Sequence, residues 1–150
     1  MSAIDLSGRV ALVTGGSRGI GRAIAVCLAE AGADVAINYV ANETAATGAL
    51  SAVKGAGRRG VAVRADVSNA EAVAAMVGEV TEALGPVDIL VNNAGIATPR
   101  AIEETTEADF VHTLAINLTS SFLCSQAVLP GMRGRKWGRL IFITSGAAHS

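Results

Sequence analysis

The sequence predicts an α/β fold, a doubly wound parallel sheet of about five strands within a single domain of 150 residues. Short apolar runs alternate along the chain with segments whose apolar residues recur at helical spacing. The runs are nearly continuous, which is typical of parallel strands buried on both faces. A glycine-rich turn joins the first run to the first helical segment. Right-handed crossovers would then place helices on both faces and a ligand at the carboxyl ends of the strands.

The first strand and the first helix meet at the glycine-rich turn. Residues 10–13 are apolar, and Gly15-Gly-Ser-Arg-Gly-Ile-Gly21 follows Thr14. Apolar residues then recur at helical spacing from Ile20 to Ala31, and Gly32 is expected to end this helix. The next expected elements are a strand at 35–39, an alanine-rich helix at 43–53 and a strand at 61–65.

The second half of the chain continues the alternation. Ser68-x-x-Glu71 predicts a capping box at the start of the third helix. The buried stripe expected behind it is Val73, Met76, Val77, Val80 and Leu84. Gly85-Pro86 should end that helix before a strand at 87–91, and Thr106-x-x-Asp109 predicts a cap on a long helix that ends near Pro130. The apolar residues of the long helix are Phe110, Leu114, Leu118, Phe122 and Val128, and the fifth strand is expected at 139–144.

Composition narrows the class of protein. The chain is 51% hydrophobic and 17% charged with a net charge of −1, so we expect a globular domain that binds neither nucleic acid nor a membrane surface. No apolar run reaches the length of a membrane span, and the N-terminus lacks a secretory pattern. Cys27 and Cys124 are interpreted as core residues of a reducing compartment, with no disulfide and no metal site. A cytoplasmic location is therefore expected.

The glycine-rich turn predicts a site for a dinucleotide. Gly15, Gly19 and Gly21 carry no Cβ, so the backbone can turn sharply and approach a pyrophosphate. The N–H groups and the positive dipole end of the following helix would face that anion. The spacing Gly-x-x-x-Gly-x-Gly differs from the commonest fingerprint, but strand, turn and helix occur in the required order. The residues assigned to this part of the site are Gly15, Ser17, Arg18, Gly19, Ile20 and Gly21.

Other polar motifs follow the later strands. Asp66-Val67 comes after the third strand and Asn92-Asn-Ala-Gly95 after the fourth, Asn117 interrupts the apolar long helix, and Ser145 follows the fifth strand. Together with the glycine-rich turn, these motifs resemble a short-chain dehydrogenase/reductase of the single-domain, Rossmann-only kind. The resemblance covers residues 7–150 with every motif in order. The overall sequence pattern is similar to that of the 3-oxoacyl-carrier-protein reductases.

The resemblance implies a role for each motif. Asp66 would hydrogen-bond the adenine amino group while Val67 packs on the ring, and the turn containing Asn93, Ala94 and Gly95 would hold the fourth strand against the cofactor. Asn117 would kink its helix and hold a water of a proton relay. Ser145 would donate a hydrogen bond to the substrate carbonyl. Simpler alternatives remain open: a helix-entry aspartate, an ordinary Asn/Gly turn, a satisfied structural asparagine and a strand-end serine.

The end of the second strand favours NADP over NAD. An acidic residue there would bind the ribose 2′-hydroxyl and repel a 2′-phosphate, but the strand ends in Asn38 and Tyr39, and Asp34 lies at its start. Arg18 could pair with a 2′-phosphate, whereas a cation without an anion is disfavoured at a helix N-terminus. Asn38 and Tyr39 are expected to line the adenosine end of the pocket.

One part of the family's mechanism is missing from the sequence. The proton donor of the family is a tyrosine with a lysine four residues later, in the segment after the serine. Here the one tyrosine is Tyr39 and the lysines are Lys54 and Lys136. His112 and His149 are weaker candidates for the role of proton donor. We therefore interpret residues 1–150 as an NAD(P)-binding Rossmann domain that is incomplete at its C-terminal end, the N-terminal part of a longer reductase.

Three functions remain open. The first is an NADP(H)-dependent oxidoreductase that transfers hydride between nicotinamide and a carbonyl or secondary alcohol of a small-molecule substrate. The second is a non-catalytic dinucleotide-binding module, and an epimerase or dehydratase is a weaker third. The complete protein is expected to form a homotetramer or homodimer, partly through the long helix at 114–128.

Overall fold

The structure is a computed structural model that describes residues 4–145. Its centre is one sheet of five parallel strands in the order β3-β2-β1-β4-β5. The strands are β1 Val10–Val13, β2 Asp34–Tyr39, β3 Gly60–Arg64, β4 Ile89–Asn92 and β5 Arg139–Phe142. The order places β1 in the middle, with the chain winding outward first to β3 and then to β5. The predicted doubly wound α/β class is confirmed.

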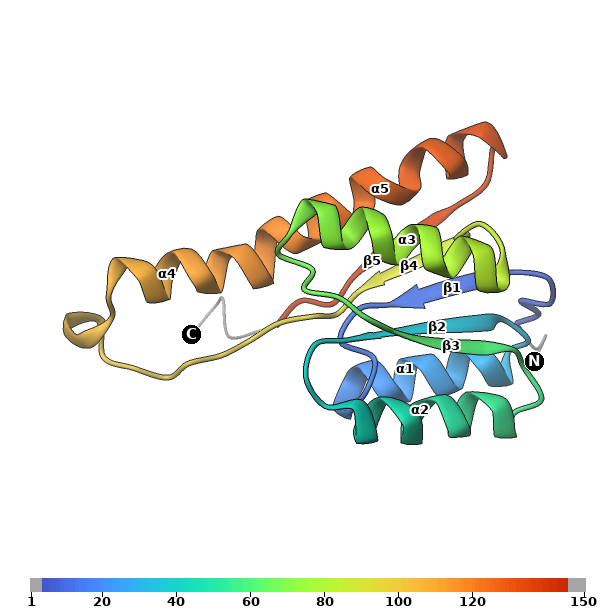
Figure 1. The fold of residues 1–150 in the computed structure, drawn as a ribbon, viewed down its shortest axis with the longest axis horizontal. Helices are drawn as coiled ribbons and strands as arrows, with labels where there is room; N and C mark the ends of the chain where they lie inside the picture. Colours follow the sequence, from blue (N-terminus) through green and yellow to red (C-terminus); the bar gives the residue numbers. More distant parts are fainter. Residues whose placement is uncertain (1–3, 146–150) are drawn as a thin grey trace.

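Helices cover both faces of the sheet, as Figure 1 shows. The helices α1 (Gly19–Glu30) and α2 (Glu43–Gly55) lie on one face. On the other face lie α3 (Ala70–Leu84) and α5 (Ser120–Gly134). The short helix η1 (Ile102–Glu104), α4 (Glu107–Leu114) and the π-helical segment η2 (Ala115–Thr119) precede α5, and α4 extends beyond the sheet.

The two faces of the sheet bury separate cores. Leu12 and Leu90 face α3 and α5, where they pack with Met76 and Val128. Their sequence neighbours on the same strands face α1 and α2. Because both faces are covered, residues 10–13 of β1 and 89–91 of β4 are apolar without a break, and this accounts for the continuous runs in the sequence. Each fully buried side chain of this size contributes about 1.5–3 kcal/mol.

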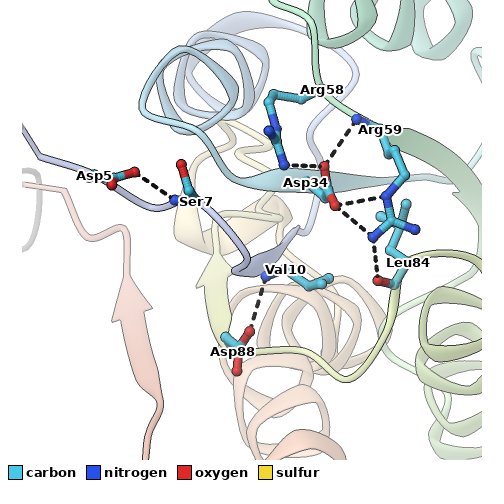
Figure 2. A network of polar contacts seen from close by, with 8 residues as sticks. All are labelled: Asp5, Ser7, Val10, Asp34, Arg58, Arg59, Leu84 and Asp88. Carbon is cyan, nitrogen blue, oxygen red and sulfur yellow. Dashed lines mark hydrogen bonds and ion pairs between the residues drawn. The ribbon is translucent and has the colours of Figure 1, made fainter.

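Buried aspartates hold the amino ends of the strands (Figure 2). Asp34 accepts hydrogen bonds from Arg58 Nη2 and Arg59 Nε, each at 2.9 Å, and Arg59 Nη2 also donates to the carbonyl of Leu84. Asp88 accepts a hydrogen bond from the N–H of Val10 at 3.1 Å. The one carboxylate of β2 is therefore committed to the edge of the sheet opposite the glycine-rich turn.

The helix caps are predicted correctly in one case and wrongly in another. The Thr106 hydroxyl accepts from Asp109 N–H, and the Asp109 carboxylate accepts from Thr106 N–H, so this capping box is confirmed. The box predicted at Ser68 is wrong, because the Ser68 hydroxyl donates to Asp66 at 2.7 Å. Asn69 caps α3 instead, accepting from Ala72 N–H at 2.9 Å.

The prediction that the long helix ends near Pro130 is also wrong. Pro130 lies inside α5, which continues to Gly134. Met132, one turn from the end, is buried in the core shared with α3. Its burial stabilises the last turn and offsets the backbone hydrogen bond that Pro130 cannot donate.

The exposure of the two cysteines contradicts one expectation and confirms the other. The prediction that Cys27 is a core residue is wrong, because α1 faces the sheet with Gly21, Ala25 and Ala29 and leaves Cys27 exposed. Small residues let this helix lie close to the sheet, so its larger side chains point outward or to the side. Cys124 is fully buried, as predicted.

The outer face of the long helix is apolar but exposed. Val128 is buried, whereas Phe110, Leu118 and Phe122 are 59%, 65% and 61% exposed. Within residues 4–145, β5 is an edge strand, and Ile141 and Phe142 are likewise exposed. In the same part of the chain, no helix combines the length and the apolar character needed to cross a bilayer.

Candidate functional site

The glycine-rich turn lies at the carboxyl end of β1 and uses its glycines in different ways. Gly15 and Gly19 have positive φ angles, +60° and +53°, which L side chains rarely adopt. A Cβ on Gly21 would overlap the carbonyl oxygen of Gly15 and lie 2.5 Å from Asn93 Nδ2. A Cβ on Gly19 would meet no heavy atom within 4 Å. Gly21 therefore permits close packing within the protein, and Gly19 presents open backbone to the outside.

The turn is fastened to the segment after β4. Thr14 Oγ1 accepts hydrogen bonds from the N–H groups of Asn93 and Ala94, both at 3.0 Å. Asn93 Nδ2 donates to the carbonyls of Thr14 and Gly15 at 2.9 and 3.2 Å. Asn93 and Ala94, predicted to bind a cofactor, therefore also fix the shape of the glycine-rich turn. Sequence reasoning did not single out Thr14, although a hydroxyl between an apolar strand and a glycine-rich turn is a usable signal.

A second buried amide fastens the turn to β2. Asn38 Oδ1 accepts from Gly15 N–H at 3.2 Å, and the backbone carbonyl of Asn38 accepts from Gly16 N–H at 3.0 Å. Asn38 Nδ2 donates to the carbonyl of Ala65 at 2.9 Å. The polar atoms of this side chain are thus engaged by backbone, while its neighbour Tyr39 is partly exposed at the strand end.

The N-terminus of α1 has no side-chain cap. Its N-cap residue is Arg18, and its first turn contains no acidic residue. By contrast, Asn42, Asn69 and Thr106 cap α2, α3 and α4 with their side chains. The positive end of the α1 dipole is therefore left for an anion, and the open backbone at Gly19 leaves space for one. This donor set fits the pyrophosphate of a dinucleotide.

The residues around the turn differ in exposure. Arg18, Gly19 and Ile20 are exposed, and Ser17 is partly buried. An exposed isoleucine at the start of a helix exposes apolar surface beside the N–H groups. This combination of apolar surface and N–H donors suits a ligand with both a charged and an apolar part.

Asp66 and Val67 follow β3 at the same edge of the sheet. Asp66 is exposed and accepts from the Ser68 hydroxyl at 2.7 Å and from Ser68 N–H at 2.9 Å. These two hydrogen bonds lower the pKa of Asp66 below its ordinary value, so it is a carboxylate at neutral pH. The side chain of Val67 is buried in the core beside α3.

Asn117 holds the segment that leaves β4. Its Oδ1 accepts from Ile96 N–H, and its Nδ2 donates to the Ile96 carbonyl, both at 2.8 Å. This amide is exposed although it lies among apolar residues of the sequence, and it belongs to the π-helical segment η2. Ser120 closes that wide turn, since its hydroxyl donates to the Ile116 carbonyl at 2.6 Å. Ser120 was missed because hydroxyls that bond one turn back are common in helices.

The remaining candidates lie farther along the chain. Ser145 is exposed after β5, at the edge where Ile143 N–H donates to the Asn92 carbonyl. Gly95 lies next to Asn117, because a Cβ there would be 3.5 Å from Asn117 Oδ1. His112 is exposed on α4. His149 lies outside the described residues.

Comparison with known proteins gives a consistent result. The family model described as short chain dehydrogenase matches residues 9–150. The chain is 40% identical to an NADPH-dependent aldehyde reductase-like protein of Arabidopsis thaliana, covering 98% of this chain and 59% of that protein. It is 40% identical to a 3-oxoacyl-[acyl-carrier-protein] reductase of Synechocystis, covering 95% and 58%.

A solved structure of a dehydrogenase is also similar to this chain. A 7α-hydroxysteroid dehydrogenase in complex with NADH and 7-oxo glycochenodeoxycholic acid superposes with a TM-score of 0.92 at 35% identity. The superposition covers 99% of this chain and 57% of that structure. The chain thus spans somewhat more than half the length of these relatives. Fold, motif order and family match agree, and the chain belongs to the short-chain dehydrogenase/reductase family.

Proposed function

We propose that the complete protein is an NADP(H)-dependent oxidoreductase that interconverts a carbonyl and a secondary alcohol. The observation that carries the proposal is the uncapped N-terminus of α1, fastened through the glycine-rich turn to β2 and β4. Relatives named for NADPH-dependent aldehyde reduction and 3-oxoacyl reduction support both the reaction and the cofactor. The hydroxysteroid dehydrogenase holds NADH, so NAD is the competing cofactor.

We propose cofactor roles for residues at the carboxyl ends of the strands. The backbone from Gly15 to Gly21, including Ser17 and Ile20, would hold the pyrophosphate, and Arg18 would pair with a 2′-phosphate. Asn38, Tyr39, Asp66 and Val67 would border the adenosine. The segment Asn93, Ala94 and Gly95 would lie against the nicotinamide end. A bound nicotinamide would supply or accept the hydride.

Ser145 and Asn117 are the proposed residues for the reacting end. The Ser145 hydroxyl would donate to the substrate oxygen as negative charge develops there. Asn117 would hold the loop at Ile96 in place through the two hydrogen bonds described above. The alkoxide also needs a general acid. The family's Tyr-x-x-x-Lys pair does not occur among the 150 residues, since the sole tyrosine, Tyr39, is followed four residues later by Glu43.

The test is NADPH oxidation by the protein as its source produces it, with carbonyl substrates of increasing size. Ser145→Ala should lower kcat about 10²–10³-fold, the cost of removing one donor to a developing oxyanion. Thr144→Ala removes a neighbouring hydroxyl and serves as the matched control. If NADPH binds with no turnover of any carbonyl, the alternative stands: a non-catalytic dinucleotide-binding module.

We further propose that the complete protein is cytoplasmic and assembles as a homotetramer or homodimer through α4 and α5. The exposed apolar face formed by Phe110, Leu118 and Phe122 supports the assembly. The two free cysteines support the location, because a reducing compartment keeps thiols unpaired. Sedimentation velocity of the protein from its source should show a dimer or tetramer. Phe122→Lys should shift it toward the monomer, and a monomeric wild type would contradict this assembly.

A further inference from the structure

The carboxyl ends of β2 and β3 lie beside the glycine-rich turn. The two strands pair in parallel with Tyr39 opposite Arg64, the last residue of each. Asn38, one residue earlier, bonds to the N–H groups of Gly15 and Gly16. The end of β3, the end of β2 and the glycine-rich turn therefore lie at the same end of the sheet (Figure 1).

Arg64 is anchored at this edge by only one of its donors. Its Nε donates to the carbonyl of Val40 at 2.9 Å, just beyond the end of β2. A guanidinium has five N–H donors, so the four on its two terminal nitrogens remain for other partners. The side chain is exposed, and the Val40 bond fixes its head over the segment between β2 and α2.

Half of the ten arginines in residues 4–145 are paired with carboxylates, and Arg64 belongs to the unpaired half. Among residues 4–145 the ion-paired arginines are Arg9, Arg58, Arg59, Arg100 and Arg135. Arg64 and Arg18 take part in none of these ion pairs. Two aspartates of this part of the sheet are engaged elsewhere, since Asp34 is held at the opposite end of β2 and Asp66 is bonded to Ser68. Glu43 is exposed in the first turn of α2 and is in none of these ion pairs either.

We propose that Arg64 binds the 2′-phosphate of NADP(H) and sets the preference for NADP over NAD together with Arg18, an inference that rests on the proposed function. In dinucleotide-binding sheets the ribose 2′ position lies at the end of the second strand, where a carboxylate selects NAD and an arginine accommodates a 2′-phosphate. Arg18 belongs to the glycine-rich turn, and Arg64 is held at the end of β2 by its hydrogen bond to the carbonyl of Val40. A phosphate dianion between two guanidinium groups would be held by charge-assisted hydrogen bonds from both.

The anchor to Val40 distinguishes this arginine from a mobile surface cation. A long side chain that is already fixed by one hydrogen bond loses less conformational entropy when its remaining donors bind. Lysine at this position would keep the charge but lose the Nε donor. The inference therefore separates the contribution of the charge from that of the anchor.

Calorimetric titration with two nucleotides tests the inference without requiring turnover. Adenosine 2′,5′-bisphosphate contains the 2′-phosphate, and 5′-AMP lacks it. Arg64→Gln should weaken binding of the bisphosphate about tenfold and change binding of 5′-AMP less than twofold. Arg64→Lys should give an intermediate loss. Arg133→Gln, which removes the same charge from an exposed position on α5, is the matched control and should change neither.

The outcomes separate this inference from the function on which it rests. If the wild type binds both nucleotides and Arg64→Gln binds the bisphosphate as the wild type does, Arg64 has no such role and the proposed function stands. An Arg64→Lys variant equal to the wild type overturns the role of the Val40 anchor. If the folded wild type binds neither nucleotide, the proposed function fails and the inference fails with it.

Discussion

The side chain of Asn117 makes two hydrogen bonds of 2.8 Å to the backbone of one residue, Ile96, accepting from its N–H and donating to its carbonyl. The bonds join the π-helical segment η2 to the loop that leaves β4. Gly95, the last residue of the predicted Asn-Asn-Ala-Gly segment, immediately precedes Ile96. The position of this loop at the proposed reacting end therefore depends on the wide turn that contains Asn117.

Ser120→Ala should loosen this connection. The Ser120 hydroxyl donates to the Ile116 carbonyl within the wide turn, and its loss leaves that carbonyl without this partner at a cost of about 1–2 kcal/mol. Amide exchange at Ile96, followed by NMR, should become roughly tenfold faster. Thr113→Ala is the control, because its hydroxyl makes the same kind of bond to Asp109 in α4. Equal exchange at Ile96 in the two variants would show that Ser120 does not position Asn117.

Gly21→Ala should destabilise the fold and weaken dinucleotide binding together. The added Cβ would overlap Gly15 and crowd Asn93, so the turn must shift, at a cost of about 1–3 kcal/mol. Gly78→Ala on the exposed face of α3 meets nothing within 4 Å and should instead stabilise the protein by roughly 0.5–1 kcal/mol. Urea unfolding measures both, and a Gly21→Ala variant as stable as the wild type would refute the packing role.

The sequence predicts the elements whose side chains must be buried. It fails where adjacent residues compete for the same structural role. The strands were predictable because a sheet covered on both faces requires continuous apolar runs. The cap at Asn69 was not predictable, because serine and asparagine are equally good N-cap residues. Ser68 does not cap α3 because its hydroxyl bonds to Asp66 instead. The exposure of Cys27 follows from how closely α1 approaches the sheet on its small residues, which helical spacing alone cannot show.

The same reasoning applies to the candidate site. Its glycines and polar residues could be read from motif order, because each follows a strand. The fastening of the turn by Thr14, Asn38 and Asn93 joins residues 23–80 positions apart, so it appears only in three dimensions. The anchoring of Arg64 to Val40 is likewise a tertiary contact.

Asp34→Asn should make the free energy of unfolding less dependent on pH in the acidic range. Burial alone would raise the pKa of Asp34, but the hydrogen bonds and charges of Arg59 and Arg58 outweigh it and hold the pKa below its ordinary value. A lowered carboxyl pKa gives stability that is present above the unfolded value, about 3.9, and lost as the pH falls through the folded value.

The measurement is the free energy of unfolding from urea titrations between pH 7 and pH 2.5. At pH 7 the variant should be less stable than the wild type by about 1–3 kcal/mol. The difference should shrink as the pH falls below about 4. A difference that stays constant across this range would mean that the ionised form of Asp34 contributes nothing.

The two cysteines should differ in reactivity. Burial raises the pKa of the Cys124 thiol to about 11, so little thiolate forms at neutral pH, whereas Cys27 is exposed. Iodoacetamide should therefore modify Cys124 at least about a hundredfold more slowly than Cys27, as followed by peptide mass spectrometry. Cys27→Ser should remove the fast phase, and equal rates at the two sites would contradict the burial of Cys124.

The most direct test of the account is an NMR titration of the chain with NADPH, read at backbone amides. The account predicts saturable shifts at residues 15–21 and at the strand-end segments 38–39, 66–67 and 93–95, with weaker binding of NADH. Amides of the α5 and β5 segment at 129–140 should not move. A folded chain that shows no shifts at 15–21, or shows them only at 129–140, would contradict the assignment of the glycine-rich turn as the dinucleotide site.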